Sequence, residues 1–150
     1  MIQRIQSLYL LIISLLSLLL INGAYLTYTD TSGAVQSLYV IGLSRAVFQV
    51  AVTERIVEIL VALIPLLAFT AIFLFSKRTV QMMLTKIVIA LIVVFIGVTC
   101  YLLFVVIPSD TSLNSWFKML VPAVQLLLAV MAYSGIKRDD NLIKSYDRLR

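Results

Sequence analysis

Four long apolar runs constrain this chain more than any other feature. They lie at about residues 3–24, 53–75, 86–107 and 115–136. About 20 consecutive apolar residues, wound as an α-helix, span the hydrocarbon core of a bilayer. Composition agrees, because 62% of the residues are hydrophobic and only 13% are charged, whereas soluble domains carry about 25% charged residues. The sequence therefore predicts an integral membrane protein with a single four-span domain over residues 1–150.

The first run has two interpretations. Arg4 precedes an apolar stretch that ends at Asn22, Gly23 and Ala24, which follows the outline of a cleaved signal peptide. Asn22 is a poor residue where cleavage needs a small one, and three more apolar runs follow. We therefore expect a first transmembrane helix over about residues 3–24.

The basic residues predict the orientation. If both termini are cytoplasmic, nine Lys and Arg residues lie on the inner side and three on the outer side, which accounts for all twelve. Cytoplasmic segments of membrane proteins carry an excess of Lys and Arg. This bias explains the net charge of +5 without nucleic-acid binding. The sequence predicts an all-α fold, a four-transmembrane-helix up-down bundle with both termini in the cytoplasm.

The long segment 25–52 is expected outside the membrane, between the first two helices. Two stretches rich in aromatic, β-branched and Thr residues, 24–29 and 35–41, flank Asp30–Gly33. Asp and Gly stand at the first and fourth positions that type I turns prefer. We expect either a small β-hairpin or a loop in which Tyr25, Tyr28 and Tyr39 lie at the level of the lipid headgroups.

A stripe of small and polar residues runs along the fourth apolar run. Pro122, Gln125, Ala129 and Ala132 recur three or four residues apart, so they share one face of a helix. We expect this face to pack on neighbouring helices rather than to line a transport pathway. Because an amide is costly in hydrocarbon unless it is hydrogen-bonded, Gln125 is predicted to make an intramembrane polar contact.

The tail, residues 137–150, is predicted to form a short amphipathic helix capped by Asp139 or Asp140. Such a helix lies along the inner leaflet, docks under the bundle or binds a cytoplasmic partner, and the sequence leaves all three open. The candidate interaction residues are its apolar face and its last two arginines: Leu142, Tyr146, Arg148, Leu149 and Arg150.

No catalytic, cofactor-binding or metal-binding pattern is visible in the sequence. The chain has no histidine, one cysteine (Cys100) and no glycine-rich phosphate loop. We expect that the protein is not an enzyme and binds no cofactor. We expect instead a non-catalytic subunit or scaffold of a membrane complex. Its expected partners are membrane lipid and either another protein or a second copy of the chain, without nucleic acid.

Two alternatives stay open. A small transporter or carrier of an uncharged or lipid-like substrate would have Gln125 as its interior polar group. A membrane enzyme acting on lipid would take its general base from Glu54, Glu58, Asp139 or Asp140, residues that helix capping explains more simply.

The two ends of the chain carry a further signal. The chain opens with MIQRIQSLYL and closes, from Arg138 to Arg150, with RDDNLIKSYDRLR. Both ends resemble the end signatures of a bacterial membrane-protein family described as domain of unknown function 4293, and the resemblance covers the whole length. It implies a small, uncharacterised protein of the bacterial inner membrane and assigns no catalytic or binding residue.

Overall fold

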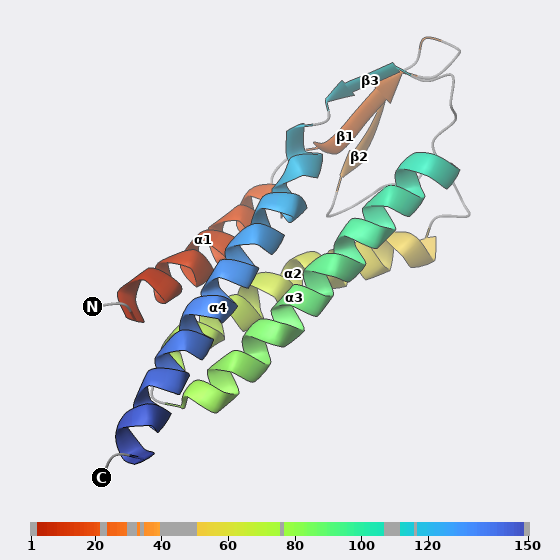
Figure 1. The fold of residues 1–150 in the computed structure, drawn as a ribbon. Helices are drawn as coiled ribbons and strands as arrows, with labels where there is room; N and C mark the ends of the chain where they lie inside the picture. Colours follow the sequence, from red (N-terminus) through yellow and green to blue (C-terminus); the bar gives the residue numbers. More distant parts are fainter. Residues whose placement is uncertain are drawn as a thin grey trace.

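Four α-helices and a small sheet make up the described part of the fold (Figure 1). The computed structural model describes residues 3–21, 24–29, 33, 35–39, 51–75, 77–106, 112–115 and 117–148. Helices α1 and α3 each pack against both α2 and α4, and the sheet lies beyond one end of the helices. The helices are α1 (Gln3–Ile21), α2 (Ala51–Phe73), α3 (Arg78–Tyr101) and α4 (Leu120–Arg148), and the strands are β1 (Ala24–Thr29), β2 (Val35–Tyr39) and β3 (Ser112–Ser115).

Small and large apolar residues share the interior, and the outer surface carries many large apolar ones. Several of the fully buried positions are alanines: Ala68 and Ala71 on α2, and Ala129 and Ala132 on α4. Bulky side chains such as Leu127 are exposed along the helices. Membrane helices associate in this way because small residues let their backbones approach closely, while lipid solvates the large apolar side chains.

Three helices have the length and composition of membrane spans within the described residues. Their apolar stretches are Ile56–Phe73, Arg78–Val105 and Phe117–Ser145. The apolar stretch of α1, Ile5–Ile21, is shorter. The prediction of a membrane protein is therefore confirmed through three candidate spans.

The predicted strand pair is confirmed, and the sheet has a third member. Strands β1 and β2 pair antiparallel, and Gly33 between them has a φ of 78°, in the left-handed region that glycine adopts without strain. Strand β3 pairs antiparallel with the other edge of β1, so β1 is central. A two-stranded hairpin alone is marginal in water, and the third strand makes it a more stable unit.

The prediction of a separate short C-terminal helix is wrong. Helix α4 runs without a break from Leu120 to Arg148, so residues 137–148 continue the fourth helix. No proline follows Pro122, which stands in the first turn where its missing N–H is not needed. Asp139 and Asp140, expected as caps, lie inside α4, where Asp140 forms an ion pair with Lys144 one turn later.

The helix ends also differ from the expected boundaries. Helix α3 begins at Arg78 instead of near Lys86, because the polar residues of the connector already follow helical geometry. The α2–α3 connection is correspondingly tight, and the Lys77 amide donates to the carbonyl of Leu74 at 3.0 Å. A π-helical segment, Leu102–Val106, extends α3, and a 3₁₀ turn, Phe117–Met119, precedes α4.

Candidate functional site

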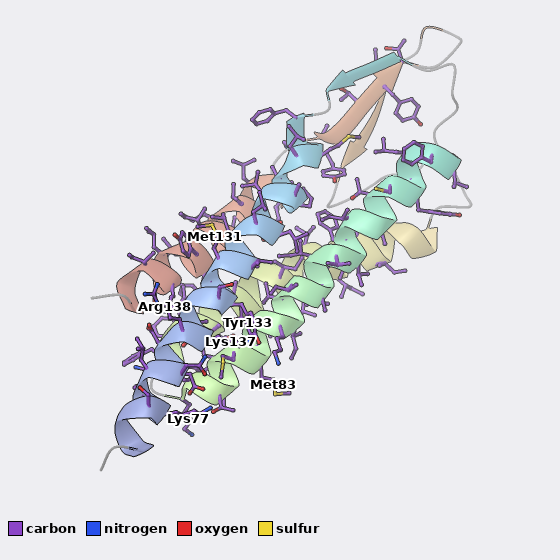
Figure 2. The ribbon with its side chains drawn as sticks, in the orientation of Figure 1. Lys77, Met83, Met131, Tyr133, Lys137 and Arg138 are labelled. Atoms are coloured by element: carbon purple, nitrogen blue, oxygen red, sulfur yellow. The ribbon has the colours of Figure 1, made fainter. Side chains whose placement is uncertain are left out.

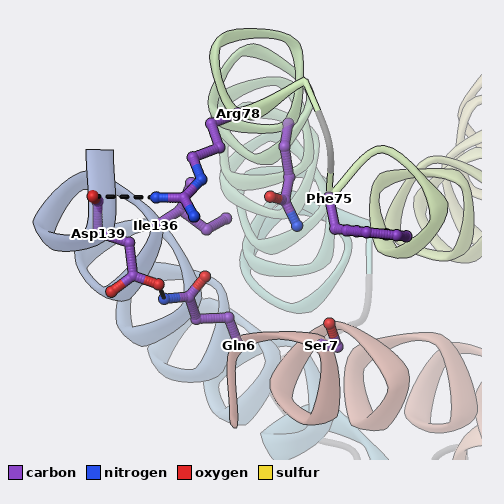
Figure 3. A pocket seen from close by; sticks show the side chains of 7 residues that line it. Gln6, Ser7, Phe75, Arg78, Ile136 and Asp139 are labelled. Carbon is purple, nitrogen blue, oxygen red and sulfur yellow. Dashed lines mark hydrogen bonds between the residues drawn. The ribbon is translucent and has the colours of Figure 1, made fainter. Parts of the chain in front are cut away.

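A buried polar cluster joins three helices at the end of the molecule opposite the sheet (Figure 3). Gln6 on α1 and Asp139 on α4 are both buried, and the Gln6 Nε2 donates to the Asp139 Oδ2 at 2.8 Å. The Arg78 Nη1, from the first turn of α3, donates to the backbone carbonyl of Asp139 at 3.0 Å. One residue of α4 thus accepts hydrogen bonds from two other helices.

Gly135 makes this approach of α1 to α4 possible. A Cβ atom at position 135 would stand 2.9 Å from the Cγ and 3.2 Å from the Nε2 of Gln6. Real Cβ atoms do not come so close to other heavy atoms, so any side chain here must displace Gln6. Gly135 lies one helical turn before Asp139, so both residues are on the same face of α4. The Gln6 side chain packs on the glycine and bonds to the carboxylate.

The cluster borders a small open pocket with room for about one water molecule. Its lining comes from all four helical regions: Gln6 and Ser7 of α1, Phe75 just after α2, Arg78 and Gln81 of α3, and Ile136 and Asp139 of α4. Gln81 is only 4% exposed and lines the pocket. The pocket therefore offers both signs of charge and an amide to a ligand.

Basic residues surround this end of the helices. Lys77, Lys137 and Arg138 are exposed there, and the Lys86 ammonium lies 5.7 Å from the centre of the Tyr133 ring, within the range of a cation–π contact (Figure 2). Together with Arg78, these residues give this end of the helices a positive charge.

Gln125 lies in the middle of the interface between α4 and α1. Its Nε2 donates to the Ser17 Oγ at 2.8 Å and to the carbonyl of Ile13 at 3.2 Å, while the Ser17 hydroxyl donates to that same carbonyl. The Oε1 of Gln125 has no partner among the described residues. The other three residues of the predicted stripe, Pro122, Ala129 and Ala132, are also buried.

We expect Gln125→Leu to lower the free energy of unfolding by about 0.6 kcal/mol, the average for hydrogen bonds between membrane helices. The effect stays small because the leucine also removes the unpartnered Oε1. Unfolding in mixed micelles of the single variants, of Ser17→Ala and of the double variant measures the coupling. Additive single effects would contradict a direct Gln125–Ser17 bond, and Val124→Leu on the exposed face is the control.

A third polar contact ties the sheet to α3. The Thr99 hydroxyl donates to the carbonyl of Phe95 at 2.9 Å, so the Tyr25 hydroxyl, 3.0 Å from the Thr99 Oγ1, is the donor between these two side chains. The Tyr25 ring also lies 6.0 Å from the Phe95 ring. Burial raises the pKa of Tyr25 to about 12, although the bond to Thr99 acts in the opposite direction. Strand β1 is thereby held on the end of α3.

The structure describes the predicted tail residues unequally. Leu142 is exposed on α4. Tyr146 and Arg148 belong to the same helix, but the side chains of these two residues lie outside the described part. Leu149 and Arg150 lie wholly outside it. Sequence reasoning missed the Gln6–Asp139–Arg78 cluster. The signal for it was the presence of polar residues at the predicted inner ends of three different spans.

Within the described residues, no group of three His, Cys, Asp or Glu side chains is arranged to hold a metal ion. Asp139 is instead engaged with an amide and shares its pocket with a guanidinium.

Comparison with known proteins supplies a family but no activity. Neither a curated protein nor a solved structure matches the chain. One family model matches residues 2–149, nearly the whole chain, and it includes both end segments and all four helices. The chain therefore belongs to the family described as Domain of unknown function (DUF4293).

Proposed function

We propose that the chain is a four-span protein of a bacterial inner membrane with both termini in the cytoplasm. The apolar stretch of α1 has 17 residues, the lower limit of the range of about 17–25 that spans a bilayer. Its packing between α2 and α4 supports a full span. Lys77, Lys137 and Arg138 lie at the end opposite the sheet. They support a cytoplasmic position for that end, because positive charge gathers on the cytoplasmic side of membrane proteins.

Cysteine labelling tests this topology. In a Cys100→Ala background, Val35→Cys on the sheet should react with an impermeant thiol reagent applied to cells with a permeabilised outer membrane. Thr79→Cys near the basic end should react only after the inner membrane is lysed. Both positions are exposed in the structure. The opposite pattern of labelling would overturn the orientation, and equal labelling of both positions would overturn the four-span arrangement.

Within the membrane, the chain acts as a non-catalytic subunit or scaffold of a protein complex. The observation that carries this proposal is the end of α4. The helix has 29 residues, a length of about 43 Å, whereas the hydrocarbon core is about 30 Å thick. Asp139, Asp140 and Lys144 are charged and do not belong in hydrocarbon. The last turns of α4 therefore extend into the headgroups and the aqueous phase.

Two large apolar side chains stand on this extension. Leu142 is 46% exposed and Ile143 is 43% exposed, and they stand between the charged residues Asp140 and Lys144. Covering apolar side chains that otherwise contact water lowers the free energy of the system. The surface formed by Leu142 and Ile143, here called the α4 tip, therefore suits a protein contact at the cytoplasmic face.

The size of the complex in mild detergent tests the proposal. We expect the wild-type chain to migrate on native gels in one discrete species larger than the single chain. Leu142→Ser with Ile143→Ser should release the single chain, because the apolar contact is lost. The matched control, Lys137→Gln with Arg138→Gln, removes charge from the same helix and should leave the complex intact. Migration of the wild type as a single chain, or loss of the complex only in the charge variant, would contradict the proposal.

A further inference from the structure

We propose that the outer edge of the contact between α3 and α4, at the basic end of the helices, binds the headgroup of an anionic phospholipid, of the phosphoglycerol class. This surface, here called the α3–α4 seam, is formed by Lys86 of α3 and by Tyr133 and Lys137 of α4 (Figure 2). The inference goes beyond the proposed role in a complex. Only the assignment to the inner leaflet rests on the proposed topology, because the seam attracts the same lipid in either leaflet.

Helix geometry brings the three side chains of the seam together. Tyr133 and Lys137 are four residues apart on α4, so they lie on one face of that helix, one turn apart. The Lys86 ammonium reaches this face from α3, since its Nζ lies 5.7 Å from the centre of the Tyr133 ring. Two ammonium groups and a phenolic hydroxyl therefore occupy the same short stretch of the seam.

Both lysines keep their hydrogen-bond donors for a ligand. The face of the Tyr133 ring attracts the Lys86 ammonium by charge and does not take up its three N–H donors in conventional hydrogen bonds. Lys86 and Lys137 are exposed, and among the described residues neither forms an ion pair. Phosphate oxygens are strong acceptors for ammonium donors, because such hydrogen bonds are assisted by charge. The seam therefore suits a phosphate.

The charge of the seam decides which phosphate headgroup it accepts. Lys86 and Lys137 contribute two positive charges, and the neighbouring acids of α4 are engaged elsewhere, Asp139 with α1 and Asp140 with Lys144. A phosphoglycerol headgroup meets only attraction here. The ammonium of an ethanolamine or choline headgroup meets two charges of its own sign. The seam therefore favours a phospholipid with a net negative charge over a zwitterionic one.

The apolar residues next to the charges favour a lipid over a soluble anion. Val93 lies two turns beyond Lys86 on α3, and Val130 lies one turn before Tyr133 on α4, so both valines follow the seam toward the sheet end. Val93 is 51% exposed and Val130 is 46% exposed. An acyl chain can lie against these valines while the phosphate stays at the lysines. Basic sites between membrane helices bind anionic headgroups in this way.

The test uses the purified full-length chain in a maltoside detergent and three phospholipids with identical acyl chains. The headgroups are phosphoglycerol, phosphoethanolamine and phosphocholine. Native mass spectrometry gives the affinity of each lipid, and the shift in melting temperature gives its stabilisation. We expect the phosphoglycerol lipid to bind about tenfold more tightly than the other two. Equal binding of all three lipids, or tighter binding of a zwitterionic one, would overturn the proposal.

Two double variants separate the seam from the general basic surface. Lys86→Gln with Lys137→Gln should weaken binding of the phosphoglycerol lipid at least tenfold. The matched control, Lys77→Gln with Arg138→Gln, removes two charges from the same end of the helices but outside the seam. Figure 2 shows Arg138 on the other side of α4 from Lys137, and Lys77 precedes the start of α3.

The control should change lipid binding less than twofold. All four substituted side chains are exposed, so both double variants should keep the lipid-free melting temperature of the wild type. Equal losses of lipid affinity in the two double variants would reduce the effect to general surface charge and would contradict the seam.

Tyr133→Phe keeps the test valid if the lysine variant fails to fold. It removes only the hydroxyl and leaves the ring beside Lys86, so it should preserve the lipid-free melting temperature. Loss of one donor to the phosphate should weaken the phosphoglycerol lipid several-fold. Unchanged lipid binding in this variant would contradict the site. Free glycerol phosphate distinguishes the source of the headgroup: if it binds as tightly as the lipid, the ligand is a soluble phosphate and the lipid assignment is wrong.

Discussion

Phe95→Ala is expected to lower the free energy of unfolding by about 3 kcal/mol, the largest effect of any single substitution considered. Phe95 is fully buried, and its ring contacts that of Tyr25, which bonds to Thr99. Truncation of a buried phenylalanine to alanine costs about 3–5 kcal/mol in soluble proteins. The cost is the sum of the transfer free energy of the removed atoms and the free energy of the cavity left behind. We expect the lower end of this range, because the phenylalanine side chain faces lipid instead of water in the unfolded state. The transfer contribution is then small, and most of the loss comes from the cavity.

Equilibrium unfolding in mixed micelles measures this effect. The control is Phe104→Ala, since Phe104 is 85% exposed and its removal leaves no internal cavity. We expect that variant to stay within about 0.5 kcal/mol of the wild type, as for most surface substitutions. Equal losses of unfolding free energy in the two variants would contradict the prediction. They would mean that the packing of β1 on α3 does not itself stabilise the fold.

Gly135→Val is expected to lower the free energy of unfolding by about 1–3 kcal/mol, the usual cost of inserting atoms into a packed interface. The valine must push Gln6 away from the Asp139 carboxylate, because even its Cβ would stand 2.9 Å from the Gln6 Cγ. The higher helix propensity of valine offsets only a few tenths of a kcal/mol.

Gly97 provides the matched control for Gly135. It also lies inside a helix, but a Cβ at position 97 meets no atom within 4 Å. Gly97→Val should therefore leave stability unchanged or raise it slightly. If both glycine variants change the free energy of unfolding by the same amount, the close approach of Gln6 to Gly135 does not contribute to stability.

Some of the fold follows from the sequence alone, because the underlying physics is local. A run of apolar residues has few stable alternatives to a helix in lipid, since every backbone polar group must be bonded within the segment. The β1–β2 pair was also predictable, from two β-prone stretches around Asp30 and Gly33. The small residues of α4 likewise marked a packing face before their neighbours were known.

Strand β3 was not predictable in this way. Its residues, Ser112–Ser115, include no β-branched or aromatic side chain, and their extended conformation comes from pairing with β1. That pairing joins segments more than 80 residues apart, and only the packing of α1 beside α4 brings them together. A local pattern carries no information about such a partner.

Helix α4 and Asp139 show most clearly what the tertiary structure decided. By itself the sequence determined the apolar spans, the uneven distribution of positive charge and the positions of the small residues. It left Asp139 as a plausible helix cap, because an aspartate favours a helix start when only its neighbours in the chain are considered. In the folded protein Gln6 and Arg78 supply partners from two other helices, so Asp139 is held inside α4 and the helix continues to Arg148. The polar pocket exists for the same physical reason, since its charges become neighbours only when the helix ends meet.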